Sequence, residues 1–426
     1  MNIHIKNGRV IDPANGVDAK QDLYIVNGKI AALGNAPDGF SADKAIDASG
    51  LIVAPGLVDL SARLREPGYE YKATLESEMQ AAVQGGVTSL VCPPDTDPAL
   101  DEPGLVEMLK HRARLLNQAN VYPLGALTVG LKGEALTEMA ELTDAGCIAF
   151  SQADHPILDT TVLLRAMQYA QTFGFSVWLR PQDPHIGRSG VAHSGPVASR
   201  LGLPGVSPMS ETLALYTILE LVRATGARVH LCRLSSAAGI ELVRAAKKEG
   251  LPVTCDVGAH HVHLTEVDIG FFDSNARLTP PLRGQRDRDA IRLALLDGTI
   301  DAICSDHTPV DDDEKMLPFG EASAGATGLE LLLSLALKWT DDSKKEVDLP
   351  RALAKITSEP ARIAGLPGGQ LAVGSAADVI VFDPAARWTV ATGALASQGK
   401  HTPFLGYELS GQVKTTIVAG HVAFER

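Results

Sequence analysis

The sequence predicts an α/β fold, a (β/α)8 TIM barrel with a small β-sandwich domain formed from both chain ends. Three observations lead to this prediction. From about residue 57, a short apolar run, a polar break and an amphipathic helical stretch follow one another eight times. Glycine recurs immediately before the apolar runs. The two ends of the chain instead carry short alternating strands with turn pairs.

The eight apolar runs are the expected barrel strands. A helical stretch follows each run, which predicts parallel strands joined by crossover helices. No glycine-rich dinucleotide fingerprint follows the first run, so a closed barrel is favoured over an open doubly wound sheet. The predicted strands are residues 57–63, 88–94, 121–128, 147–152, 175–181, 228–234, 252–260 and 300–306.

Glycines mark the ends of the predicted helices. A residue free to adopt a left-handed backbone is needed where a helix stops before the next strand. Six glycines stand at this position of the repeat: Gly86, Gly146, Gly174, Gly226, Gly250 and Gly298.

The chain ends predict a separate β structure. Asn7-Gly8 and Asn27-Gly28 are turn pairs between short strands, and AADVIVFDP and GQVKTTIVAGHVAFER continue the pattern near the end. We expect residues 1–53 and 369–426 to form one composite β-sandwich domain, and residues 54–368 to form the barrel.

Composition excludes some classes of partner. Among 426 residues the formal net charge is −13, which argues against nucleic acid and against an anionic membrane as partners. No apolar run approaches the roughly 20 residues of a membrane span. The first ten residues alternate like a strand and not like a signal peptide, and the five cysteines lack CxxC spacing. We expect a cytoplasmic protein.

Polar residues gather at the strand ends, where the active site of such a barrel lies. The first strand alternates, so that Asp59, Ser61, Arg63 and Arg65 share one face. The later strand ends carry Asp95, Gln152, Asp154, Arg180, Asp183, Arg233, His260, His261, His263, Asp306 and His307.

Several segments together resemble the long, bacterial-type dihydroorotases of the amidohydrolase superfamily. They are APGLVDL, RLREPG, GGVTSLVC followed by PPDTDP, HLCRLSS, TPPLR, DGTIDAICSDHTP and AADVIVFDP. The resemblance covers nearly the whole chain, with the segments in the family's order.

The resemblance implies that the metal site is degenerate. Active members carry His-x-His where this chain has Ser61 and Arg63, and an aspartate where it has Gln152. Their single histidine ligands correspond to Arg180 and Arg233, and only Asp306 is retained. A guanidinium stays protonated and offers no lone pair, and a hydrolytic zinc needs about three protein ligands. We therefore predict no metal ligands, no catalytic residues and no cofactor.

The substrate side of the site is also changed. Arg65 matches the carboxylate-binding arginine of the family, but Asp95 replaces an asparagine and Val310 a histidine. Asp95 should weaken the binding of dihydroorotate because it adds negative charge. Arg65, Asp95 and His261 are the residues of a candidate anion-binding or substrate-like pocket.

Two roles are open for the three arginines. In the first, Arg63, Arg180 and Arg233 replace the metal charge and pair with Asp306 and with Asp95 or Asp183. In the second, they bind a carboxylate or phosphate effector. A relocated metal site at His230, His260, His261, His263, His307 and Asp306 is a further alternative to simple packing of these histidines. Ser61 has no neighbouring base in the sequence that would make it a nucleophile.

The resemblance also implies a non-catalytic function. It indicates a catalytically inactive dihydroorotase homologue that assembles with aspartate transcarbamoylase catalytic chains in pyrimidine biosynthesis, as a homo-oligomer (dimer) within a larger complex. The alternatives are an active cyclic-amide hydrolase with an unusual metal site and an effector-binding regulatory subunit.

Overall fold

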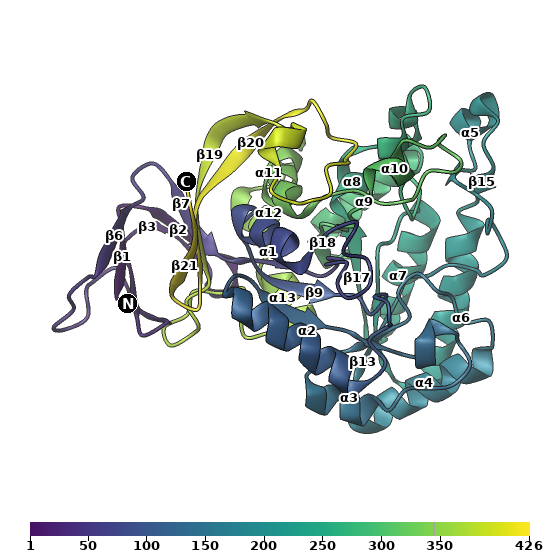
Figure 1. The fold of residues 1–426 in the computed structure, drawn as a ribbon, viewed down its shortest axis with the longest axis horizontal. Coiled ribbons are helices and arrows are strands. Elements are labelled where there is room, and N and C mark those ends of the chain that lie inside the picture. Colours follow the sequence, from purple (N-terminus) through teal and green to yellow (C-terminus); the bar gives the residue numbers. More distant parts are fainter. Residues whose placement is uncertain (344–345) are drawn as a thin grey trace.

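The computed structural model describes residues 1–343 and 346–426. Its centre is a barrel of parallel strands surrounded by helices, with the sandwich at one side (Figure 1). The barrel strands are β8 (Leu57–Asp59), β9 (Val87–Cys92), β10 (Asn120–Pro123) with its continuation β11 (Gly125–Ala126), β12 (Phe150–Ser151), β13 (Ser176–Leu179), β16 (Arg228–Leu231), β17 (Val253–Gly258) and β18 (Ala302–Cys304).

The barrel closes between its last and first strands. Ala62 and His307 form a parallel bridge, and the Ser305 amide donates to Asp59 Oδ1 at 2.8 Å. Every predicted strand overlaps an observed strand, and the parallel ladders join neighbours in chain order. The predicted (β/α)8 barrel is confirmed.

Helices alternate with the strands. They are α1 (Leu75–Gln84), α2 (Pro103–Leu116), α3 (Met139–Ala145), α4 (Thr160–Phe173), α6 (Met209–Thr225), α7 (Ala237–Glu249), α9 (Gln285–Asp297) and α11 (Leu332–Asp342). Shorter elements lie between them: β14 (Ala192–His193), α5 (Pro196–Leu201), β15 (Gly205–Val206), α8 (Ala259–His263), α10 (Asp312–Lys315), α12 (Leu349–Ala354) and α13 (Ser358–Ala364). The six predicted helix-ending glycines all have positive φ, from 70° at Gly226 to 109° at Gly146.

The seventh strand differs from its prediction. It ends at Gly258, and residues from Ala259 turn into the short helix α8. His260, His261 and His263 therefore lie on a helix at the barrel mouth. Glycine at the helix N-cap, followed by alanine and histidines without a further β-branched run, allows this change of backbone.

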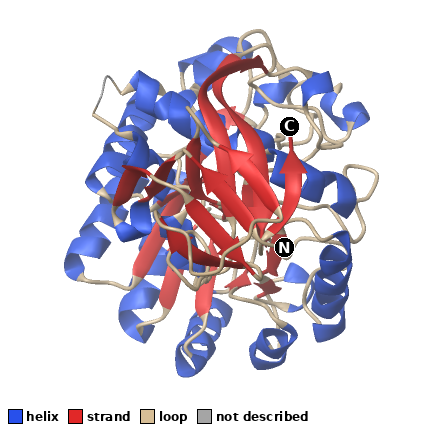
Figure 2. Cartoon of the chain, turned by 90° about the vertical axis from the view of Figure 1, so that its left-hand side faces the viewer, coloured by secondary structure: helices blue, strands red, loops and turns tan. Residues whose placement is uncertain are grey.

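Both chain ends build the sandwich. One sheet has the order β5 (Lys29–Leu33), β4 (Leu23–Val26), β1 (Ile3–Lys6), β6 (Lys44–Asp47). The other has the order β21 (His421–Glu425), β20 (Glu408–Val418), β19 (Val379–Thr389), β7 (Ile52–Pro55), β2 (Arg9–Asp12), β3 (Val17–Lys20). In Figure 2, which faces this end of the molecule, these strands lie in front of the ring of helices. The boundaries at residues 53/54 and 368/369 stay a prediction.

A separate apolar core lies between the two sheets. It includes Ile5, Ile25, Val53 and Val379, each at most 1% exposed. The larger sheet also packs on the barrel, because Thr416 Oγ1 on β20 donates to the carbonyl of Val83 in α1 at 2.7 Å. The larger sheet of the sandwich thus supports the barrel helices.

None of the helices in the described part of the chain combines the length and apolar character needed to cross a membrane. The five cysteines are free thiols, and all except Cys232 are buried.

Candidate functional site

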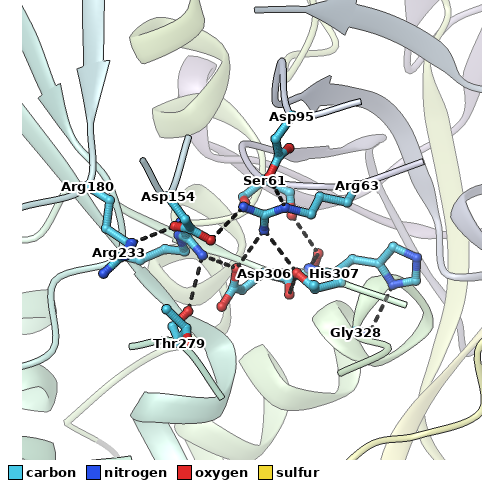
Figure 3. A network of polar contacts seen from close by, with 12 residues as sticks. Ser61, Arg63, Asp95, Asp154, Arg180, Arg233, Thr279, Asp306, His307 and Gly328 are labelled. Carbon is cyan, nitrogen blue, oxygen red and sulfur yellow. Dashed lines mark hydrogen bonds and ion pairs between the residues drawn. The ribbon is translucent and has the colours of Figure 1, made fainter. Parts of the chain in front are cut away.

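Three arginines and three aspartates meet at the carboxyl ends of the barrel strands (Figure 3). Arg63 donates from Nε to Asp95 Oδ2 at 2.8 Å and from Nη2 to Asp154 Oδ2 at 2.8 Å. Arg233 donates from Nη1 to Asp306 Oδ1 at 2.9 Å and from Nη2 to Asp154 Oδ1. The Nε atom of Arg180 donates to the same Asp154 oxygen. We call these six residues the mouth network.

The formal charges of the mouth network cancel, with three guanidiniums against three carboxylates. The arginine side chains are only 5–7% exposed, so this pairing matters for their stability. Burial disfavours the charged form of Asp154, but the guanidiniums of Arg233, Arg180 and Arg63 outweigh it and hold its pKa well below the ordinary value. Burial opposes the charge of Arg233 as well, yet Asp154 and Asp306 raise its pKa.

Two residues of the mouth network, Arg233 and Asp306, have a strained left-handed backbone that sets the direction of their side chains. Arg233 follows β16 with φ of 55°, and Asp306 follows β18 with φ of 49°. Arg65 and Ala153, also at strand ends, share this left-handed conformation. Non-glycine residues rarely adopt it, and such positions concentrate at functional sites. The Asp256 carboxylate stabilises the turn at Arg233, since Oδ1 accepts the Arg233 amide at 2.6 Å.

Ser61 and Gln152 lie beside the network without joining its ion pairs. Ser61 is 6% exposed, and its carbonyl accepts from the His307 amide at 3.1 Å. The Gln152 Oε1 accepts from Thr128 Oγ1 at 3.0 Å. Both positions are filled by buried polar side chains, and Nε2 of Gln152 has no hydrogen-bond partner among the described residues.

The residues of the candidate anion-binding pocket are not brought together as a pocket. Asp95 belongs to the mouth network. Arg65 donates from Nε to the Pro309 carbonyl at 2.9 Å and lies over the Tyr69 ring. His261 contacts the Pro281 carbonyl through Nε2 at 3.2 Å, and burial lowers its pKa to about 4, which keeps the ring neutral.

Asp154 is the network member that sequence reasoning undervalued. It stands two residues after Gln152, the position that matches the family's aspartate, and this nearness was the only signal in the sequence. Asp183, the alternative partner considered for the arginines, is not part of the network. Its Oδ1 instead accepts the amides of His185 and Ile186 at 2.9 and 2.7 Å.

The residues at the mouth do not fit the metal that the family resemblance implies. Arg63, Arg180 and Arg233 have no lone pair for a cation. Both oxygens of Asp154 accept from guanidiniums, and Asp306 Oδ1 accepts from Arg233. Within residues 1–343 and 346–426, no group of three or more His, Cys, Asp or Glu side chains is arranged to hold a metal ion.

The histidines near the mouth have structural contacts. His307 Nδ1 accepts from the Gly328 amide at 3.1 Å, which directs Nε2–H to Glu78. His230 Nε2 lies 3.0 Å from Asp256 Oδ2. His260 stacks on Phe404, and burial lowers its pKa to about 3. His263 Nε2 lies 2.9 Å from the Leu335 carbonyl. These contacts favour packing over a relocated metal site.

A cavity of about 320 Å³ opens above the mouth network. Its lining is dominated by arginines, which are Arg63, Arg180, Arg188, Arg233, Arg277 and Arg283. Asp154, Asp306 and Glu211 are the carboxylates of the lining. The volume falls in the range of small-ligand pockets.

Comparisons with known proteins agree with this architecture. The dihydro-orotase-like family model matches residues 50–238, and the amidohydrolase family model matches residues 212–424. Among solved structures, the L-hydantoinase (dihydropyrimidinase) of Arthrobacter aurescens has a TM-score of 0.87 at 24% identity and covers 99% of this chain and 96% of its own. At that identity the likeness shows the fold.

Closer relatives extend over the full length. A dihydroorotase-like protein of Pseudomonas aeruginosa is 47% identical over 425 residues, and the one of Pseudomonas putida is 46% identical over 422, with at least 99% of each chain covered. A dihydroorotase of Geobacter metallireducens is 40% identical over 426 residues, with both chains fully covered. The chain belongs to the dihydroorotase-like family of the amidohydrolase superfamily.

Proposed function

We propose that this chain is a catalytically inactive dihydroorotase homologue that acts as a structural subunit in the assembly of aspartate transcarbamoylase in de novo pyrimidine biosynthesis. The observation that carries the first half of the proposal is the mouth network. Guanidiniums occupy the positions at which the family resemblance implies metal ligands, and they form ion pairs with Asp154 and Asp306.

The loss of chemistry follows from the requirements of the reaction. Hydrolysis of a cyclic amide by this family needs a metal-bound water whose pKa falls near 7, held by about three protein ligands. Three fixed positive charges disfavour a dication at the same place. No group in the mouth network takes over the role of a base, because its carboxylates are held by guanidiniums.

The second half of the proposal rests on the family resemblance and on the intact fold. The barrel closes, most of its helices end at glycines, and the sandwich is complete, although the mouth lacks the ligands that the resemblance implies. Selection for an interaction surface would account for this combination. We propose a dimer of this chain within a larger, cytoplasmic complex with the catalytic chains of aspartate transcarbamoylase.

Two measurements test the proposal. The purified chain, loaded with zinc during expression, is expected to bind no stoichiometric zinc and to leave dihydroorotate unchanged, while an active dihydroorotase prepared alongside does both. Co-expression with aspartate transcarbamoylase catalytic chains is expected to give one large assembly by native mass spectrometry. Separate species at all concentrations would refute the assembly role.

A second function is favoured by one observation. Relatives 38–40% identical over the full length carry the name dihydroorotase. A hydrolase with an unusual metal arrangement would be consistent with those names. Stoichiometric zinc together with turnover of dihydroorotate would establish it and remove the inactive assignment, whatever the outcome of the assembly experiment.

A further inference from the structure

Arg277 is a cationic residue of the mouth cavity that the network does not neutralise. Its side chain is half-buried, and Nε is buried without a hydrogen-bond partner among the described residues. Its hydrogen bond in the structure is a long one of 3.4 Å from Nη1 to the Leu278 carbonyl. Burial lowers the pKa of Arg277, and no carboxylate in the described chain counters that effect. An uncompensated, half-buried guanidinium is costly unless an anion accompanies it.

The backbone of Arg277 is held by a buried lysine. Lys315 is 1% exposed, and its Nζ donates to the carbonyls of Ser274, Arg277 and Ser323 at 2.9, 3.2 and 2.9 Å. These bonds tie α10 to the loop that carries Arg277. They hold the Arg277 backbone in place, and burial lowers the pKa of Lys315 to about 7.

Two more arginines of the cavity lie outside the mouth network. Arg283 donates from Nε to Ser235 Oγ at 3.1 Å and from Nη1 to the Val206 carbonyl at 2.5 Å. Arg188 is exposed at the cavity rim. Neither forms an ion pair with a carboxylate of the described chain.

The cavity therefore has a surplus of positive charge. Outside the mouth network, Arg188, Arg277 and Arg283 face one carboxylate of the lining, that of Glu211. The Glu211 oxygens already accept from the amides and hydroxyls of Ser235 and Ser236. Glu211 and, outside the lining, Asp287 both act on Arg283. The surplus of positive charge therefore lies mainly at Arg188 and Arg277, in a chain whose net charge is −13. Low-dielectric walls around such a cleft focus its field on small anions.

We propose that this cavity binds a small dianion, a dicarboxylate or a phosphate, with Arg277 as its principal contact and Arg188 and Arg283 as its neighbours. The arginines of the mouth network form the floor of the site and do not bind the anion, because Asp95, Asp154 and Asp306 already neutralise them. A planar guanidinium offers paired N–H donors that match the oxygens of either ligand. The proposal does not depend on the assembly role, because the binding is a property of the isolated chain.

Isothermal titration calorimetry on the full chain tests the site, with inorganic phosphate and succinate as separate probes in a low-salt chloride buffer. Saturable binding of at least one probe is expected. Arg277→Gln should weaken it about tenfold or more, the loss expected for one charge-assisted bidentate contact. Arg351→Gln, at an exposed position on α12, is the matched control and should bind as the parent does.

The outcomes distinguish the chemical classes of ligand. Binding of phosphate alone assigns the site to phosphorylated compounds, binding of succinate alone assigns it to dicarboxylates, and binding of both assigns it to dianions in general. If Arg277→Gln does not fold, Arg188→Gln replaces it, since this exposed residue has no side-chain hydrogen bond or ion pair in the described chain. A several-fold weakening is expected. The proposal is overturned if neither probe binds at about 10 mM, or if the variants bind as tightly as the parent.

Discussion

The guanidinium of Arg63 and the carboxylate of Asp154 form an ion pair across the barrel mouth, with Nη2 2.8 Å from Oδ2. The two residues are 91 positions apart and follow different strands, β8 and β12. Asp154 also contacts Arg180 and Arg233, so one carboxylate connects all three arginines. This carboxylate is the central counter-charge of the mouth network.

Asp154→Asn should therefore destabilise the fold strongly. Removing one partner of a buried ion pair typically costs about 3–5 kcal/mol, because the remaining charges stay buried. Asp183→Asn is the matched control, because an asparagine oxygen can still accept the two amides that Asp183 accepts. Thermal unfolding of both variants checks the prediction, and equal midpoints would contradict the central role of Asp154.

Stability should depend on pH through the same residue. The pKa of Asp154 in the folded chain lies well below its ordinary value, which is close to the value in the unfolded chain. Below pH of about 4 the unfolded state thus binds more protons, and stability falls as the pH falls through the folded pKa. Chemical denaturation from pH 7 to 2 should show a steeper acid loss in the parent than in Asp154→Asn. Parallel pH profiles of stability in the parent and in Asp154→Asn would refute this role of Asp154.

Glu78 should hold the C-terminal segment on the barrel. Its Oε2 accepts from His307 Nε2 at 2.5 Å and from Ser397 Oγ at 2.7 Å, and its Oε1 accepts the Gln398 amide at 3.0 Å. Glu78→Gln should cost about 1–3 kcal/mol and speed amide exchange at Ser397 and Gln398, because buried donors lose an acceptor.

Glu76→Gln is the control for this effect, since Glu76 is exposed on the same helix. Hydrogen-exchange mass spectrometry reports the segment directly. Unchanged protection around residue 397 in Glu78→Gln would show that other contacts hold the segment.

Single reversions should not create an active enzyme. Arg233→His removes one guanidinium, but Arg63, Arg180, Ser61 and Gln152 still occupy positions where the family has ligands. It also leaves Asp154 and Asp306 with one cationic partner fewer, so stability should fall as well. Zinc analysis and a dihydroorotate turnover assay check this, with the parent chain as the reference. Turnover above the parent would contradict it.

Much of the barrel could be predicted because its signals are local. Apolar runs and helix-ending glycines express backbone preferences within a few residues, and all eight predicted strands overlap observed ones. The strand predicted at 252–260 extended two residues too far, because β17 ends at Gly258 and Ala259 and His260 begin the short helix α8. Boundaries depend on capping geometry, which periodicity does not report.

The candidate site was less predictable. The identities of Arg63, Arg180 and Arg233 are visible in the sequence, but their partners are not. Asp183 follows Arg180 by three positions and contacts none of the three, whereas Asp154 precedes Arg180 by 26 positions and contacts them all. Proximity along the chain was a poor guide because residues that share a barrel mouth come from separate strand ends.

By itself, the sequence determined the (β/α)8 repeat and the presence of guanidiniums at the strand ends, because periodicity and side-chain chemistry are properties of the residues. Only the tertiary structure decided which charges are neutralised. The closed barrel places Asp154 against three arginines and leaves Arg277 half-buried, with no ion pair to a carboxylate among residues 1–343 and 346–426. Ion pairing depends on distances of a few ångströms between groups far apart in the chain, and folding alone sets those distances.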